Sequence, residues 1–348
     1  MSPDSIREVL RQVCYPGFSR DIVSFGLVKE ISCEAGLTTV RIEVQTRDAK
    51  VPEQIFRDCH AVLDPLPGVG SVEVEIDVKD APATGGHGGD SGKVMIPGVK
   101  RIIAVASGKG GVGKSTVAAN LAVALLATGA KVGLCDCDLY GPSVALMFGI
   151  HDRPLANARN EIIPLQAHGI QLMSMGFMLD DRSPVVVRGP MAHRYTRQFL
   201  LQVAWADLDY LVLDLPPGTG DIQLTVVQTV LVDGVIIVTT PQEVALIDAR
   251  KAVAMFEKVN VPILGLIENM AWFECDAGKK YYLFGEGGGV REAEVLKVPL
   301  LGRIPFDVVT RERGDSGAPV VLLDPEQNRV AAAFHEVAVR IRAAVPAA

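Results

Sequence analysis

The feature that most constrains the fold is a glycine-rich loop, GKGGVGKS, at residues 108–115. It fits the pattern G-x-x-x-x-G-K-[ST], in which backbone amides and a lysine surround a phosphate group. The apolar run Ile102–Ala106 before the loop is typical of a buried strand, and Ser115–Leu126 after it is typical of a helix. A chance glycine-rich turn would lack this strand–loop–helix context. The sequence therefore predicts a phosphate-binding loop in an α/β domain.

Strand-like runs alternate with helical segments through residues 100–348. Several of these runs are apolar on both faces, as in a parallel sheet that is covered on both sides. The pattern predicts an α/β fold with a doubly wound, mostly parallel sheet, against which the helix Arg329–Val345 packs. The predicted strands are Ile102–Ala106, Lys131–Cys135, Gln171–Ser174, Tyr210–Leu213, Val235–Thr239, Ile263–Ile267 and Leu300–Leu301.

A smaller α/β sandwich is predicted for residues 1–80. Residues 81–92, APATGGHGGDSG, are rich in glycine and have no apolar periodicity, which is typical of a flexible linker. We therefore expect a small domain at 1–80, a linker with its lead-in at 81–99 and the phosphate-loop domain at 100–348. The elements expected in the small domain are the helix Ser5–Val13, the strands Ile22–Val28 and Thr39–Val44, the helix Gln54–Leu63 and the strand Val72–Val78.

The loop residues have separate expected roles. Lys114 is expected to reach the β- and γ-phosphates, Ser115 to ligate Mg²⁺ and Thr116 to donate to a phosphate oxygen. Lys109 is not needed by a plain phosphate loop, so it is either a solvated lysine or a second phosphate cation. The predicted nucleotide contacts in the loop are Gly108, Lys109, Gly110, Gly111, Val112, Gly113, Lys114, Ser115 and Thr116.

Acidic residues follow two of the predicted strands. Asp214 ends one strand, and Asp136 and Asp138 follow another. Because the carboxyl ends of parallel strands meet at the edge that holds the loop, we expect Asp214 and Asp136 to contribute to a Mg²⁺ site. We expect Asp138 to orient or deprotonate the attacking water. The alternative for Asp214, and more so for Asp221, is a cap at a helix N-terminus. The predicted catalytic residues are Lys109, Lys114, Asp138 and Asp214.

Asn269 follows the strand Ile263–Ile267 by two positions. An amide side chain at this edge suits hydrogen bonding to a purine, and the alternative is an asparagine that caps a turn.

Composition excludes several other classes of protein. Lys and Arg number 34 against 41 Asp and Glu, a net charge of −7, so nothing favours binding along a nucleic-acid backbone. No apolar run approaches the ~20 residues that cross a bilayer. We expect neither a signal nor a transit peptide in Met1–Arg7, and no nucleic-acid or membrane partner. Six scattered cysteines indicate reduced thiols in a cytoplasmic protein.

Six segments together resemble the Mrp/ApbC family of P-loop ATPases, which act as iron–sulfur cluster carriers. Residues 1–80 also resemble the small domain that precedes the ATPase in bacterial members, so the resemblance covers nearly the whole chain. The segments are the loop with Lys109, DCDLYGPS at 136–143, DLPPGTGD at 214–221, TTPQEVALIDARKA at 239–252, ENM at 268–270 and YYLFGEGGG at 281–289.

The resemblance implies a homodimeric, ATP- and Mg²⁺-dependent ATPase with slow turnover. Such a protein would pass iron–sulfur clusters to apo-protein clients and work with assembly factors. Lys109 matches the family's signature lysine, which contacts nucleotide bound by the facing subunit. Asp138 and Asp214 fall on the two switch segments, and Asn269 matches the asparagine on the adenine side.

The same resemblance implies a [4Fe–4S] cluster that bridges the dimer through cysteines after residues 268–270. Many relatives have a C-P-x-C pair there, whereas this chain reads FECDAGK with only Cys275. Two copies of Cys275 supply two thiolates, and four is the usual requirement. Two hypotheses follow: a cluster carrier with Cys275 as a ligand, or an ATP-gated scaffold or adaptor that has lost stable cluster binding. A positioning ATPase that acts on DNA or membranes is a third class, which the acidic charge does not favour.

Overall fold

The computed structural model describes residues 3–13, 21–23, 27–34, 37–45, 50–66, 69–79, 93–177, 196–197 and 199–347. The chain divides into two compact units, Met1–Asp90 and Ser91–Ala348. The predicted linker at 81–92 lies outside the described residues. The lead-in from residue 93 to residue 99 belongs to the second unit, because Val94 pairs with Val230 and Ile96 is buried in its core.

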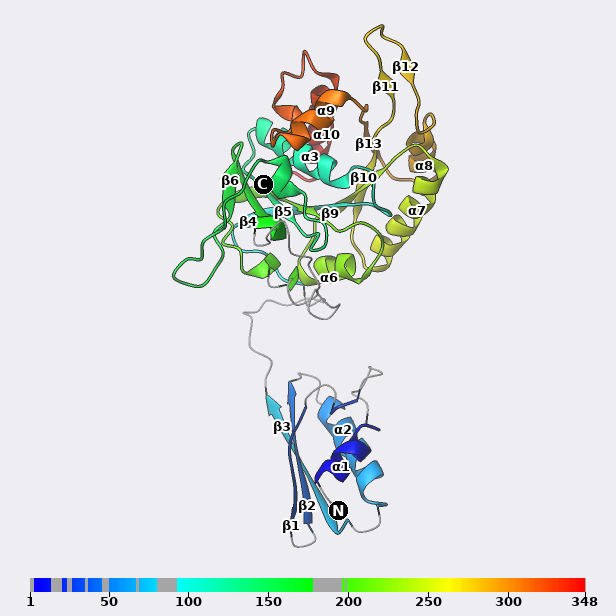
Figure 1. The fold of residues 1–348 in the computed structure, drawn as a ribbon. Coiled ribbons are helices and arrows are strands. Elements are labelled where there is room, and N and C mark those ends of the chain that lie inside the picture. The colour runs from blue at the N-terminus through cyan, green and yellow to red at the C-terminus, as the bar shows by residue number, and fades with distance from the viewer. Residues whose placement is uncertain are drawn as a thin grey trace. The chain divides into compact units, whose positions relative to one another are not determined.

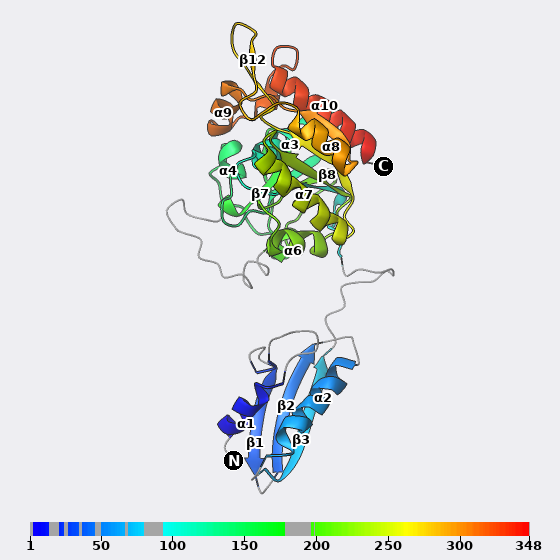
Figure 2. The same cartoon turned by 90° about the vertical axis from the view of Figure 1, so that its right-hand side faces the viewer.

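The first unit is a three-stranded sheet with two helices on one face (Figure 2). Its strands lie in the order β1-β2-β3, with β1 antiparallel to β2 and β2 parallel to β3. Alternate residues of β2, such as Val40 and Ile42, face the helices and are fully buried. The elements are α1 (Pro3–Leu10), β1 (Val28–Glu34), β2 (Leu37–Gln45), α2 (Lys50–Leu63) and β3 (Ser71–Lys79).

The predicted position of the first strand is wrong. The strand spans Val28–Glu34, whereas Ile22 lies in a turn. Ile22 is fully buried there, and its backbone N–H donates to Val13 O at 2.9 Å. Ile22 thus fills the core from a turn, whereas the true strand has two exposed residues, Lys29 and Glu30, and is half-buried from Ile31 to Cys33. The hydrophobicity of the sequence thus identified Ile22 as a core residue, but it did not identify the strand that follows it.

The second unit is built on an eight-stranded sheet, in the order β13-β10-β9-β4-β8-β5-β7-β6. All neighbouring strands are parallel except β6 and β7, which confirms the predicted fold class. The short antiparallel β6 was not predicted. The strands are β4 (Val99–Ala106), β5 (Val132–Asp136), β6 (Leu165–Ala167), β7 (Ile170–Ser174), β8 (Leu208–Asp214), β9 (Gly234–Thr239), β10 (Ile263–Glu268) and β13 (Leu300–Arg303).

Helices cover both faces of this sheet (Figure 1). Helices α3 (Lys114–Ala127) and α10 (Arg329–Ala344) pack against each other on one face, where α10 also contacts β13, and α6 (Asp221–Thr229) and α7 (Glu243–Lys258) lie on the opposite face. Ten residues of α3 are buried, which explains its small, apolar sequence. The predicted packing of the C-terminal helix is confirmed, since Phe334 and Ile341 are buried.

Short elements complete the second unit. They are α4 (Val144–Met147), the 3₁₀ turns Met175–Phe177 and Val320–Leu322, α8 (Gly288–Leu296) and α9 (Val308–Asp315). A two-stranded hairpin, β11 (Phe273–Glu274) with β12 (Lys280–Tyr281), projects beyond the sheet (Figure 1). No helix in the described part of the chain is long and apolar enough to span a membrane.

Candidate functional site

Residues 107–113 connect β4 to α3, and two of their glycines are required by close contacts. A Cβ atom on Gly108 would lie 2.0 Å from the carbonyl oxygen of Asp248, on α7. Gly113 has a φ of 80°, and a Cβ atom there would lie 2.3 Å from Nδ2 of Asn269. Larger residues at these positions would force the loop away from both neighbours. The backbone thus lies tightly against α7 and the end of β10.

A buried ion pair lies below the loop. Nζ of Lys114 donates to Oδ1 of Asp214 at 2.5 Å and to Oγ of Ser115 at 3.0 Å. The side chains of Lys114 and Asp214 are 6% and 0% exposed. Burial raises the pKa of Asp214, and Lys114 opposes part of that rise. Oδ2 of Asp214 is buried and has no hydrogen-bond partner among the described residues, so it is an acceptor available to a cation.

A cavity of about 230 Å³ opens above this pair. Apart from Gly108 and Val112, every predicted loop contact lines it. Lys109 is half-buried at its rim, and Oγ of Ser107 donates to the carbonyl oxygen of Lys109 at 2.9 Å. The structure therefore brings the phosphate-loop residues and Asp138 around one cavity. The lining residues are Ser107, Lys109, Gly110, Gly111, Gly113, Lys114, Ser115, Thr116, Asp138, Met147 and Pro217.

Asp136 is placed to shape the loop that follows β5. Its Oδ1 accepts from the N–H of Asp138 at 3.0 Å, and its Oδ2 accepts from the N–H groups of Ser143 and Val144 and from Oγ of Ser174. It is fully buried, and burial together with the charge of Asp214 raises its pKa to about 7. Its carboxylate is occupied by backbone and hydroxyl donors, so its expected Mg²⁺ role stays a prediction.

Asp138 is held in place through one of its carboxylate oxygens. Its Oδ1 accepts from the N–H groups of Tyr140 and Gly141 at 3.1 and 3.2 Å, which fixes the side chain at the cavity wall.

Cys135 and Cys137, on either side of Asp136, are buried at 0% and 3% exposure. Both thiols therefore lie in the hydrophobic core of the second unit.

The segment after β8 turns sharply beside the loop. The N–H of Gly218 donates to the carbonyl oxygen of Ser107 at 3.0 Å, and Nε2 of Gln223 donates to that of Pro216 at 2.5 Å. The residue that caps α6 is Gly220, and Asp221 begins the helix, so the alternative interpretation of Asp221 as a helix cap is wrong. The turn is held directly against the phosphate loop.

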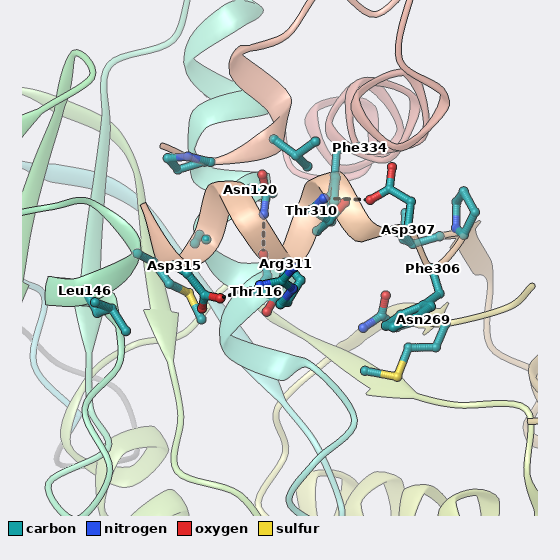
Figure 3. Close-up of a pocket in the computed structure, with 18 residues that line it drawn as sticks. Thr116, Asn120, Leu146, Asn269, Phe306, Asp307, Thr310, Arg311, Asp315 and Phe334 are labelled. Atoms are coloured by element: carbon teal, nitrogen blue, oxygen red, sulfur yellow. Dashed lines mark hydrogen bonds and ion pairs between the residues drawn. The ribbon is translucent and has the colours of Figure 1, made fainter. Parts of the chain in front are cut away.

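A second cavity, of about 240 Å³, lies next to the first (Figure 3). Thr116 and Met147 line both cavities. Asn269 lines the second one, where its Nδ2 donates to the carbonyl oxygen of Val112 at 2.9 Å. We call this cavity the base pocket, after the purine that Asn269 is expected to bind. Besides Asn269, it is lined by Phe306, Asp307 and Thr310 among others.

Sequence reasoning missed Phe306 and Asp307. Both follow β13, and Asp307 caps α9 by accepting from the N–H of Thr310 at 2.6 Å. Oγ1 of Thr310 is buried without a hydrogen-bond partner among the described residues. The available signal was the turn residues Pro305 and Asp307 directly after a predicted strand, at the same sheet edge as the loop.

Cys275 lies at the tip of the β11–β12 hairpin. Its N–H donates to the carbonyl oxygen of Lys279 at 3.1 Å, and its carbonyl accepts from the N–H of Gly278 at 2.8 Å. It is half-buried, as is Cys33 of the first unit, whereas Cys59 is buried. Cys14 lies outside the described residues. Within the part of the chain that is described, no group of three or more His, Cys, Asp or Glu side chains is arranged to hold a metal ion.

Comparison with known protein families covers both units. Residues 98–342 match the model of the ParA family, described as "NUBPL iron-transfer P-loop NTPase". The chain belongs to this family. Residues 3–76 match a second model, described as "Iron-sulfur cluster assembly protein". The second unit of this family member is therefore a P-loop NTPase, and its first unit is an iron–sulfur assembly domain.

Curated relatives of this NTPase share both units. A protein of Deinococcus radiodurans named "Iron-sulfur cluster carrier protein" is 44% identical over 93% of this chain and 90% of its own length. A protein of the same name from Haemophilus influenzae is 41% identical over 97% of this chain and 90% of its own.

Solved structures resemble the NTPase unit. A nucleotide-binding protein of Archaeoglobus fulgidus in complex with ADP is 41% identical, covers 63% of this chain and 87% of its own, and has a TM-score of 0.57. The cell division ATPase MinD of Pyrococcus furiosus is 26% identical, covers 70% of this chain and 99% of its own, and has a TM-score of 0.54. These likenesses confirm the fold class and a nucleotide-binding NTPase.

Proposed function

We propose that this protein hydrolyses ATP and, as a homodimer, carries iron–sulfur clusters to apo-protein clients and works with assembly factors. The observation that carries the nucleotide part is the buried Lys114–Asp214 pair beneath the phosphate loop, in which Oδ2 of Asp214 has no hydrogen-bond partner among the described residues. The cargo part is supported by family membership and by relatives named as cluster carriers. A cytoplasmic location is part of the proposal, because the cysteine thiolates that hold a cluster stay reduced in that compartment.

The two adjoining cavities suit the two ends of ATP. The phosphates would lie against the loop amides, Lys114 and Thr116, and the adenine would enter the base pocket. There one N–H of Asn269 Nδ2 is taken by the carbonyl oxygen of Val112, so Oδ1 would accept from the base and the second N–H would be left to donate. Phe306, 38% exposed, would supply an aromatic surface for the base.

The donor set beneath the loop fits Mg²⁺. Oγ of Ser115 and Oδ2 of Asp214 would hold the ion directly or through water, because hard oxygen ligands of this kind suit it. When bound, the ion would neutralise charge that develops on the phosphates. Asp138 would position the attacking water from the cavity wall, and Lys109 would reach nucleotide in the facing subunit of the dimer.

A homodimer would present two Cys275 thiolates to the cargo. A second candidate function is the ATP-gated adaptor without stable cluster binding. It is favoured by one specific observation: among the described residues, Cys275 belongs to no group of three or more His, Cys, Asp or Glu side chains arranged to hold a metal ion. Both candidates share the nucleotide site and differ only in what the β11–β12 hairpin holds.

Anaerobic reconstitution with iron and sulfide separates the two candidates. We expect iron and sulfide to bind the wild type near one cluster per dimer and to be lost in Cys275→Ala. Cys33→Ala is the matched control, since Cys33 is also half-buried but lies in the first unit. A wild-type protein that binds no cluster, but still hydrolyses ATP, would favour the adaptor and remove the carrier assignment.

A further inference from the structure

The hairpin that carries Cys275 is hydrogen-bonded to the segment that lines the base pocket. Beyond the ends of β10 and β13 the two chain segments continue side by side. The N–H of Ile304 donates to Glu268 O at 2.8 Å, and the N–H of Ala271 donates to Ile304 O at 2.9 Å. The N–H of Phe306 donates to Trp272 O at 2.8 Å. Phe306 lines the base pocket (Figure 3). Its backbone bond to Trp272 therefore attaches this pocket wall directly to the base of the hairpin.

Side chains reinforce this attachment. Glu268 is fully buried, and its Oε1 accepts from Nε of Arg303 at 2.7 Å while its Oε2 accepts from the N–H of Gly289 at 2.6 Å. The guanidinium of Arg303 lies 5.2 Å from the centre of the Trp272 ring. Nζ of Lys280, on β12, lies 4.9 Å from the same ring. One indole thus contacts a cation fixed to the sheet and a cation on the hairpin.

We propose that Trp272 is a positioning residue that couples occupancy of the base pocket to the placement and reactivity of Cys275. The inference rests on the proposed function, because it requires nucleotide in the pocket. A base that moves Phe306 or Asn269 displaces the backbone bonded to Trp272. The indole passes that displacement to Lys280, and β12 passes it to the tip through the bond between Lys279 and Cys275.

Alkylation of Cys275 by iodoacetamide, resolved by peptide mass spectrometry, measures this coupling. Cys33 in the other unit serves as the internal reference. We expect saturating ADP to change the Cys275 rate at least threefold in the wild type and not at all in Trp272→Leu. The Trp272→Leu variant should bind ADP within threefold of the wild type. Trp272→Phe keeps a ring for both cations and should restore most of the nucleotide dependence, which a merely structural role would not explain.

Lys279→Met is the matched control on the same hairpin. Nζ of Lys279 lies 5.0 Å from the centre of the Tyr281 ring. Lys279→Met removes this ammonium group and keeps the backbone bond between Lys279 and Cys275, so the nucleotide dependence should stay intact. Because the chain has two tryptophans, Trp205→Phe leaves Trp272 as the sole fluorescent reporter in otherwise intact protein. ADP should then shift or quench its emission.

The possible failures are distinguishable. ADP that binds without changing either Cys275 alkylation or Trp272 emission would overturn the coupling and leave the carrier proposal standing. A Trp272→Leu variant that keeps the full nucleotide dependence would also overturn it. A wild type that binds no ADP would overturn both.

Discussion

The ammonium group of Lys114 lies 2.5 Å from Oδ1 of Asp214, where neither side chain is appreciably exposed. Lys114 begins α3 and Asp214 ends β8, so the pair joins the phosphate loop to the segment that turns beside it. A phosphate would compete with Asp214 for Lys114 and release that carboxylate for a cation. Nucleotide binding thus exchanges ionic partners instead of burying new unpaired charge.

Replacement of Lys114 tests this relationship in two ways. Lys114→Met should abolish measurable ADP binding and, by leaving Asp214 buried without its partner, lower the free energy of unfolding by about 3–5 kcal/mol. The double variant Lys114→Met/Asp214→Asn should recover much of that stability but not the binding. Urea unfolding and ADP titration measure the two effects separately. Tight ADP binding by Lys114→Met would refute the phosphate-loop assignment.

Asp138 should be needed for hydrolysis and not for binding. Asp138→Asn keeps an acceptor for the N–H groups of Tyr140 and Gly141, so the loop should hold its shape. We expect ADP affinity within threefold of the wild type and ATP turnover lower by roughly 10²–10⁴-fold. Asp221→Asn, an exposed acid at the start of α6, should change turnover less than threefold. Equal losses in both variants would assign the water-orienting role elsewhere.

The sequence predicted the phosphate loop and the parallel sheet because both have strong local signals. The spacing of Gly108, Gly113 and Lys114 is set by chemistry within a few residues, and fully buried strands read as apolar runs. Only one side of the base pocket was predicted, the side with Asn269. Phe306 lines the same pocket because β10 and β13, which precede these two residues, pair side by side in the sheet. That pairing depends on contacts distant in sequence.

The position of the first strand of the small unit was predicted wrongly because the strong local signal lay outside the strand. Ile22 carries a strong apolar signal, but it fills the core from a turn. The strand Val28–Glu34 lies at an edge of the sheet, and its sequence, VKEISCE, has no regular alternation of apolar and polar residues that would mark a strand.

The glycine run at the start of α8 should be sensitive to a single methyl group. A Cβ atom on Gly288 would lie 2.0 Å from the carbonyl oxygen of Pro241. Because both atoms are attached directly to the backbone, no side-chain rotation can relieve the clash. Gly288→Ala should therefore lower the free energy of unfolding by about 1–3 kcal/mol. Gly314→Ala on α9 is the matched control, because a Cβ atom there meets nothing within 4 Å. It should be neutral or stabilise by up to about 1 kcal/mol. Equal effects of the two substitutions in urea unfolding would contradict this steric explanation.

The buried thiol of Cys59 should be unavailable to cargo and to reagents. Burial first, and the charge of Asp58 second, raise the pKa of Cys59 from 9.0 to about 12. At pH 8 roughly one thiol in ten thousand would be ionised, so iodoacetamide should label Cys59 at least a hundredfold more slowly than Cys275. The raised pKa of Cys59 stabilises the folded state below pH 9, and this contribution should fade as the pH rises from 9 to 12.

Two controls test the cause of the slow labelling. In Asp58→Asn, Cys59 should still be alkylated slowly at pH 8, because burial is the larger cause of its raised pKa. In urea all cysteines should be alkylated at similar rates. Rapid labelling of Cys59 in the folded protein, read by peptide mass spectrometry, would show that its burial is not maintained in solution.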